Sequence, residues 1–299
     1  MKMTYSQHSL SDYCRLFGVS RQSFYQHFRT KEHKSFHNEM ILQQVKMIRE
    51  EHPRLGTRKL MVLLYPFLHE HQITLGRDAL FDLLGHHKML VKKRKRQVQT
   101  TFSKHWMRKW PNLVKNYEAD TINHLWVSDI TYWKSGNHTF YISLITDVRS
   151  RKIIGYSLDN NLKAQSSLEA LNMAICYKPH QTAHIIHHSD RGSQYCSAEY
   201  VAKLLENNIK ISMTESGEPT DNAYAERVNG ILKEEYLYQY NPKNMAQAKA
   251  ILAQTIQLYN QKRPHLSLEN QTPNHVFKTH TRKFNRLWKS YQKTNFVNP

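Results

Sequence analysis

The chain has 299 residues and carries 43 Lys and Arg against 24 Asp and Glu, which gives a formal net charge of +19. This length suits two or three domains, and the sequence contains neither an apolar run of about 18 residues that would span a membrane nor a signal-peptide-like stretch at its start. The three cysteines form no CxxC pair, which argues against a disulfide framework or a structural zinc site and fits a reducing cytoplasm. Because a polyanion usually balances such a surplus of positive charge, and no membrane anchor is evident, we expect a nucleic-acid partner and no membrane.

Residues 1–32 are predicted to form a helix-turn-helix-like unit. The segment 9–28 has the pattern of two short helices about a turn, in which Gly18 permits a left-handed backbone and Ser20 can cap the second helix. An ordinary helical hairpin is the competing interpretation, but the charge of the chain favours DNA binding. The second helix would then present three polar side chains to a major groove: Arg21, Gln22 and Gln26.

A second helical DNA-binding unit is expected over residues 33–91. Amphipathic segments predict helices at about 38–51, from about 55 onward and at 74–84, and Pro53 ends the first of them. Arg77 would lie on the exposed side of the last helix. We therefore expect Arg77 to contact DNA.

Residues 92–118 are interpreted as a basic linker. Between residues 83 and 117 there is no Asp or Glu, whereas ten Lys or Arg occur. A solvated linker is the plain alternative, but interleaved aromatic residues such as Trp106 and Trp110 favour contact with nucleic acid. The densest basic run is expected to bind phosphates without sequence preference: Lys92, Lys93, Arg94, Lys95 and Arg96.

Residues 119–278 are predicted to form an α/β domain, followed by a basic C-terminal tail at 279–299. Three β-rich segments joined by short turns predict an antiparallel meander. After them, helices and single strands alternate, which predicts a mixed sheet with helices on its faces. The expected strands are 124–133, 138–148, 151–158, 184–190 and 210–214, and the expected helices are 164–177, 198–208, about 220–238 and 245–260.

Two acidic residues fall where such a sheet places functional sites. Asp129 lies within the first strand, and Asp190 ends the fourth, which we expect to lie beside the first. A single strand Asp more often faces water or an Arg, but two neighbouring carboxylates repel each other unless a divalent cation holds them. Oxygen ligands favour Mg²⁺ or Mn²⁺, and a third acid on a facing helix could complete a two-metal site for phosphoryl transfer.

Three sequence blocks surround these aspartates and one further acid. They are WVSDITY around Asp129, HHSDRGSQY around Asp190 and DNAYAERVNGILKEEY around Glu226, with YNQKRPHLSL and TPNHVF after them. Sixty residues separate the two aspartates, and 35 separate Asp190 from Glu226. The blocks and the second spacing resemble bacterial insertion-sequence transposases of the DDE class, which share a retroviral-integrase-like core. Retroviral integrases also carry an N-terminal His/Cys zinc domain, but Cys14 is the only cysteine in that region, so we expect no zinc.

The resemblance implies a ribonuclease H-like catalytic core in which Asp129, Asp190 and Glu226 hold two Mg²⁺ (or Mn²⁺) ions. It also implies a transposase that binds the terminal repeats of a mobile element, cleaves a DNA strand and joins the 3′-OH to target DNA. Such an enzyme is expected to act as a homo-oligomer on DNA, in a bacterial cytoplasm and associated with the nucleoid.

Position also favours Glu226 as the third acid. It would lie early on a helix that faces the strand ends, whereas Asp221 is better explained as the cap of that helix. The other acids after Asp190 are expected to face solvent, to lie in a loop or to pair with Lys233: Glu199, Glu206, Glu215, Glu218, Glu234 and Glu235.

Four more side chains could contact DNA or the reacting phosphate. His188 shares a strand face with the second aspartate, and a packing role is equally open to it. Asn222 precedes Glu226 by about one turn, and Lys233 lies two turns after it, within reach of a phosphate. Arg263 follows a helix end and would hold either DNA or the core.

Two other function classes share parts of this pattern. A nuclease of the same fold that only hydrolyses would not need helices that recognise a defined DNA end. A regulator with an inactive fold would not need an intact trio of acids. Joined products from pre-nicked ends would separate a transposase from the nuclease, and metal-dependent end cleavage would separate it from the regulator.

Overall fold

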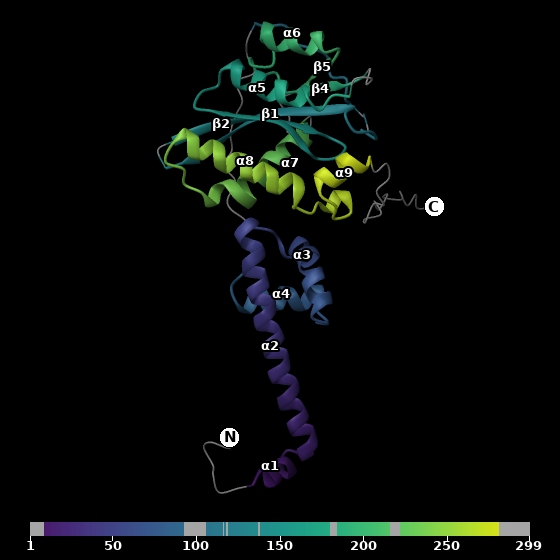
Figure 1. The fold of residues 1–299 in the computed structure, drawn as a ribbon, viewed down its shortest axis with the longest axis vertical. Coiled ribbons are helices and arrows are strands. Elements are labelled where there is room, and N and C mark those ends of the chain that lie inside the picture. The colour runs from purple at the N-terminus through teal and green to yellow at the C-terminus, as the bar shows by residue number, and fades with distance from the viewer. Residues whose placement is uncertain are drawn as a thin grey trace, which may run out of the picture.

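The computed structural model shows an all-helical N-terminal region followed by a domain built on a mixed five-stranded sheet, which confirms the predicted fold class (Figure 1). The structure describes residues 9–92, 106–115, 117, 119–136, 138–179, 184–215 and 222–280. Within these ranges, no helix is both long and apolar enough to cross a membrane.

Helix α1 (Leu10–Leu16) and the start of α2 (Arg21–Glu51) form the expected two helices about a turn. Gly18 adopts a φ of 64° in the turn, and the Ser20 hydroxyl accepts a hydrogen bond from the Ser23 backbone N–H, so both predicted signals are confirmed. Helix α2 then continues for 31 residues, because neither Gly nor Pro interrupts it. The boundary expected between residues 32 and 33 therefore falls inside a helix.

The apolar core of the helical region lies away from the first turn. Cys14 is 5% exposed, but Phe17 and Val19 are 60% and 44% exposed, so little apolar surface is buried there. The main core forms where α2 packs against α3 (Thr57–Glu70) and α4 (Arg77–His86). Its fully buried members include Val45, Leu60, Leu64, Leu80 and Leu84.

The sheet has the strand order β3-β2-β1-β4-β5. The first three strands form an antiparallel meander, as predicted, and the last two pair in parallel beyond β1. The strands are β1 (Leu125–Ser135), β2 (His138–Asp147), β3 (Ile153–Asp159), β4 (Ile186–Ser189) and β5 (Lys210–Met213).

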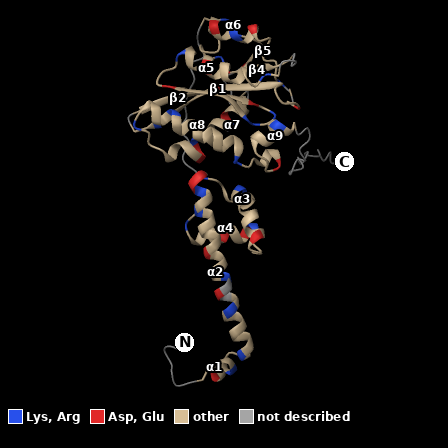
Figure 2. Cartoon of the chain, in the orientation of Figure 1, with Lys and Arg blue, Asp and Glu red and all other residues tan. Residues whose placement is uncertain are grey.

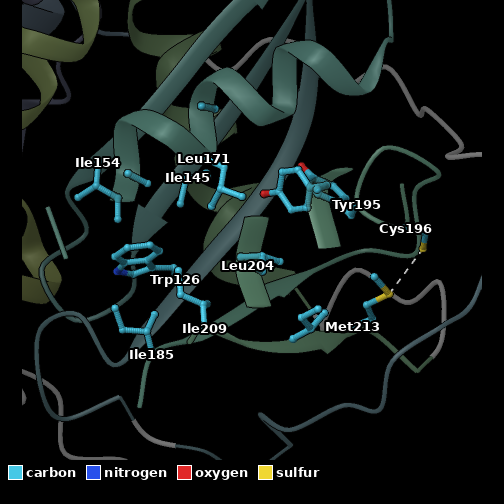
Figure 3. Close-up of a cluster of buried hydrophobic side chains, with 14 residues drawn as sticks. Trp126, Ile145, Ile154, Leu171, Ile185, Tyr195, Cys196, Leu204, Ile209 and Met213 are labelled. Atoms are coloured by element: carbon cyan, nitrogen blue, oxygen red, sulfur yellow. Dashed lines mark hydrogen bonds between the residues drawn. The ribbon is translucent and has the colours of Figure 1, made fainter. Parts of the chain in front are cut away.

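Helices cover both faces of this sheet (Figure 1). Helices α5 (Ala164–Ile175) and α6 (Ala198–Glu206) enclose one apolar cluster, which Figure 3 shows with Trp126, Leu171 and Leu204 at its centre. The opposite face packs against α7 and α8, whose bounds are Ala223–Ile231 and Met245–Gln261.

The approach of α5 to the sheet depends on one glycine. A Cβ atom added at Gly155 of β3 would lie 2.1 Å from the backbone oxygen of Ala170 in α5 and 3.1 Å from the Cβ of Ala174. Only a residue without a side chain fits this contact.

The helix expected over 220–238 is not uniform. After α7, the chain continues as a π-helical segment, η2 (Leu232–Tyr236), and a 3₁₀ turn, η3 (Leu237–Gln239). After α8 come the 3₁₀ turn η4 (Leu266–Leu268) and helix α9 (Pro273–Thr279). π-Helical turns are rare and often occur at functional sites.

The end of the predicted linker lies against the sheet. The Met213 backbone N–H donates to the Pro111 oxygen (3.3 Å), and the Leu113 N–H donates to Ser212 Oγ (2.9 Å). Met107 and Trp110 pack on the cluster beneath α6. This part of residues 92–118 is thus an integral part of the core.

Basic side chains are spread over the helices of both regions and are not gathered on one element (Figure 2). Lys93, Arg94, Lys95 and Arg96 lie outside the described residues, as do residues 281–299 of the expected basic tail.

Candidate active site

Asp129 and Asp190 come from neighbouring strands. Asp129 lies in the middle of β1, and Asp190 directly follows β4. The two strands are parallel with Val127 opposite His188, which confirms that the first and fourth strands are neighbours. Two residues further along each chain, Asp129 and Asp190 lie close enough for the charge of Asp190 to act on Asp129.

Helix α7 lies over β1 and carries Glu226 in its first turn. Two asparagines of this segment bind β1: Asn222 Nδ2 donates to the Ser128 oxygen (2.9 Å), and Asn229 Nδ2 donates to Asp129 Oδ2 (2.7 Å). Glu226 and Asn229 are three residues apart and share a helix face. Asn229 was missed in the sequence, although this spacing from Glu226 could have identified it.

The carboxyl group of Asp129 is strongly perturbed. Burial, followed by the negative charge of Asp190, raises the pKa of Asp129 to about 7. Hydrogen bonds from Asn229 and from the Ile130 backbone lower this pKa, and the charge of Glu226 raises it further. Asp129 is therefore a point at which negative charge is poorly compensated.

Gly192 shapes the surroundings of Asp190. Its backbone N–H donates to Asp190 Oδ1 at 3.0 Å. A Cβ atom at Gly192 would lie 3.0 Å from the same oxygen and 3.1 Å from Gln194 Oε1, closer than side chains ordinarily pack. The glycine in the HHSDRGSQY block thus lets the backbone hold the carboxylate.

Lys233 brings a positive charge near the acids. It belongs to η2, and its Nζ lies 5.2 Å from the centre of the Tyr132 ring of β1. Burial lowers the pKa of Lys233, and the negative charge of Asp129 acts in the opposite direction. This lysine is therefore held within the electrostatic field of Asp129.

Two residues expected to contact DNA are buried in packing contacts. His188 is 1% exposed and its Nδ1 lies 2.9 Å from Ser212 Oγ, while Arg263 is 3% exposed and donates twice to Glu235. These contacts favour the packing alternatives weighed for both. The expectation that Glu235 faces solvent or pairs with Lys233 is wrong, because Arg263 and Lys59 reach it from distant parts of the sequence.

The other predicted DNA-contact residues lie outside this site. Arg21, Gln22 and Gln26 are exposed at the beginning of α2, far from the sheet (Figure 1). Arg77 is exposed at the start of α4, where its Nε lies 2.8 Å from Asp78 Oδ1, and Lys92 is exposed after that helix. The structure does not bring these side chains together with the three acids.

The donor chemistry of the acids fits a hard divalent cation. Asp129, Asp190 and Glu226 offer carboxylate oxygens, the ligands that Mg²⁺ and Mn²⁺ prefer, and a cation would relieve the repulsion felt at Asp129. Among the described residues, however, no three His, Cys, Asp or Glu side chains are arranged as a group that could hold a metal ion. Glu226 thus does not close a three-ligand set with the aspartates.

Two solved structures resemble parts of the chain at low sequence identity. The HTLV-2 integrase catalytic core domain in complex with magnesium is 20% identical, with a TM-score of 0.42, and the match covers 52% of this chain and 97% of that one. A chain of the simian T-cell lymphotropic virus intasome, solved with PP2A regulatory subunit B56 gamma, is 19% identical, with a TM-score of 0.48. That match covers 80% of this chain and 75% of the intasome chain.

Sequence relatives and family models identify the chain more directly. Two models of the integrase core domain match residues 119–219 and 207–273. The uncharacterized 31 kDa protein of insertion element IS600 from Shigella sonnei is 33% identical over 87% of this chain and 95% of its own length. The transposase for IS629 of Shigella sonnei is 30% identical over 57% of each chain. Transposase InsF for IS3A of Escherichia coli K12 is 36% identical over 42% of this chain and 43% of its own length. The chain therefore belongs to the IS3-type insertion-sequence transposases, which carry a retroviral-type integrase core domain.

Proposed function

We propose that this transposase binds the terminal repeats of its own element, cleaves a DNA strand at each end and joins the 3′-OH to target DNA. The observation that carries the proposal is the crowding of acids at Asp129. Burial raises the pKa of Asp129 most, and the charges of its neighbour Asp190 and, to a smaller extent, of Glu226 raise it further, so the fold gathers negative charge that a divalent cation would neutralise.

We propose that Asp129 and Asp190 hold Mg²⁺ (or Mn²⁺), that Glu226 completes the ligand set from α7 only when cations bind, and that two ions bind. Ions bound there would supply charge stabilisation at the phosphate that is being transferred. The chain itself orients the ligands. Asn229 binds one oxygen of Asp129, and the Gly192 N–H binds one oxygen of Asp190.

The remaining predicted side chains are assigned by their positions and contacts. We assign Lys233, on which the charge of Asp129 acts, to a phosphate of the reacting strand, whereas Asn222 ties the start of α7 to β1. We propose that His188 and Arg263 support the site through packing. The residues proposed to read or hold the DNA outside the site are Arg21, Gln22, Gln26, Arg77, Lys92, Lys93, Arg94, Lys95 and Arg96. Holding two element ends together would require a homo-oligomer, and we place it on the bacterial nucleoid.

The decisive experiment uses duplexes that carry the element's terminal repeats, with Mg²⁺, and follows both cleavage and joining. Asp129→Asn, Asp190→Asn and Glu226→Gln are each expected to keep DNA binding and to lose both reactions. Glu199→Gln, which changes an exposed acid on α6, is the matched control and should remain active.

Pre-nicked ends test the joining step by itself. Joined products would support a transposase over a nuclease that only hydrolyses, because hydrolysis consumes no 3′-OH. Mg²⁺-dependent cleavage that persists in Glu226→Gln would refute the role of Glu226, and cleaved but never joined ends would refute strand transfer.

A further inference from the structure

The helical region and the catalytic core touch through polar side chains of η2. Lys59 Nζ of α3 lies 2.7 Å from Glu235 Oε1, and His52 Nδ1 after α2 lies 2.8 Å from the Tyr236 hydroxyl. Figure 1 shows the end of α2 and the start of α3 meeting the core below α7 and α8. Two consecutive residues of one short segment thus receive the helical region.

On the core side, Glu235 is held from a second direction. Arg263 donates from Nε to Glu235 Oε2 and from Nη2 to Glu235 Oε1, both at 2.7 Å. Such paired charged hydrogen bonds are strong and directional. Burial alone would raise the pKa of Glu235, but the hydrogen bonds and charge of Arg263, followed by those of Lys59, outweigh burial and lower this pKa. The carboxylate is therefore ionised and shared between the core and the helical region.

The same segment reaches the proposed active site on its other side. Two residues before Glu235, Lys233 lies over Tyr132 and within the field of Asp129. Helix α7, which carries Glu226 and Asn229, runs directly into η2. A side chain that fixes η2 from outside therefore also fixes the backbone that presents Lys233.

We propose that Glu235 is a positioning residue that couples docking of the helical region to the catalytic site. When Lys59 binds Glu235, η2 is held between the two parts of the protein and Lys233 is kept beside Asp129. When Lys59 leaves, Glu235 keeps only Arg263, and η2 loses its outer support. The proposal rests on the proposed function, because it assigns to the helical region the binding of DNA ends.

The test removes the contact from the helical side, so that the core pair stays intact. Lys59→Met keeps the length and apolar stem of the side chain but not its charge, and both oxygens of Glu235 still bind Arg263. Lys59→Arg preserves the ion pair and serves as the conservative variant. The matched control is Lys262→Gln, which removes an ion pair to Glu51 between the same two parts of the protein, with both side chains about half exposed.

Two measurements are made on each variant. The first is a distance distribution measured by pulsed electron paramagnetic resonance. One spin label is attached to the exposed Cys176 of the core and the other to a cysteine introduced by Tyr65→Cys in α3. The other two cysteines, Cys14 and Cys196, are buried and should not take up the label. The second is the cleavage rate with Mg²⁺ at saturating end duplex, beside the Kd for that duplex. Lys59→Met should broaden the distances and slow cleavage roughly tenfold with an unchanged Kd, while Lys59→Arg should match the parent protein.

A narrow distance distribution in Lys59→Met would overturn the docking role. Broadened distances with a full cleavage rate would overturn the coupling to the site, and an equal loss in Lys262→Gln would overturn the assignment to Glu235. If the parent protein cleaves no end duplex, the proposed function fails, whereas the distance measurement still tests docking.

Discussion

Replacing Asp129 by Asn is expected to stabilise the metal-free protein while it removes the proposed activity. Burial, and then repulsion from Asp190, raises the pKa of Asp129 from 3.8 to about 7. Each pKa unit corresponds to about 1.4 kcal/mol, so keeping this carboxylate ionised above pH 7 costs the folded state about 4 kcal/mol. Asn has a similar shape, and its oxygen can still accept the hydrogen bond from Asn229, so the variant escapes that cost.

The sign of the pH dependence follows from the raised pKa. Between pH 3.8 and 7 the folded protein binds a proton at Asp129 that the unfolded chain does not, so the parent protein gains stability from this group as the pH falls. The asparagine side chain of the variant does not titrate. The advantage of Asp129→Asn in free energy of unfolding should therefore be about 4 kcal/mol at pH 8, about 2 kcal/mol at pH 5.5 and below about 0.5 kcal/mol near pH 3.8.

Urea unfolding in EDTA at pH 8 and pH 5.5, followed by tryptophan fluorescence, measures this difference. Trp126 and Trp133 are fully buried on opposite faces of the sheet and report on the core. Adding Mg²⁺ should then stabilise the parent protein but not the variant. An advantage that is the same at both pH values, or a variant that is less stable at pH 8, would refute the reasoning.

Three further predictions concern packing, acid stability and the linker. Gly155→Ala should lower the free energy of unfolding by about 1–3 kcal/mol or more, because the new Cβ would meet the Ala170 backbone. The matched control is Gly230→Ala in α7, whose new Cβ meets nothing within 4 Å and which should raise the free energy of unfolding by about 0.5–1 kcal/mol. Urea unfolding of both variants tests this. Burial lowers the pKa of His52 to about 4, of His187 to about 3 and of His265 to about 2, so the unfolded chain alone takes up these protons below pH 6.5. As the pH falls from 6.5 to its folded pKa, each histidine should lower the free energy of unfolding by about 1.4 kcal/mol per pH unit. Asp129, which gains stability over the same range, should offset one of the three. A free energy of unfolding that stays flat from about pH 6.5 to 5 would contradict this. Replacing the five basic residues at 92–96 by Gln should flatten the plot of log K against log salt by about 0.9 for each lost phosphate contact, and an unchanged slope would show that they do not bind DNA.

The strands that carry the two aspartates could be predicted because local patterns determine them. Alternating apolar residues define β1 and β2, and the short buried run before Asp190 defines β4. Because β4 was expected to lie beside β1 in such a mixed sheet, the two aspartates were also expected to be neighbours, and the parallel pairing of β1 with β4 confirms this. The signals around Gly18 and Ser20 were equally local and also proved correct.

Features that depend on distant partners or on helix register were missed. Lys59 is 176 residues from Glu235, and Arg263 is 28 residues away, so no local pattern indicated a buried ion pair. The π-helical segment η2 has no marker such as Gly or Pro, and a uniform helix was predicted in its place. The break expected between residues 32 and 33 has no Gly or Pro to cause it, and α2 runs through that position without interruption.

The segment that ends the linker has a consequence for any attempt to isolate the catalytic domain. The integrase core match begins at residue 119, which makes that position the obvious start for a shortened protein. Such a fragment would lack Met107 and Trp110, which cover the apolar cluster, and Pro111, whose oxygen pairs with the edge strand β5. An uncovered edge strand beside an opened apolar cluster is a template for aggregation. A soluble catalytic fragment should therefore begin before Met107.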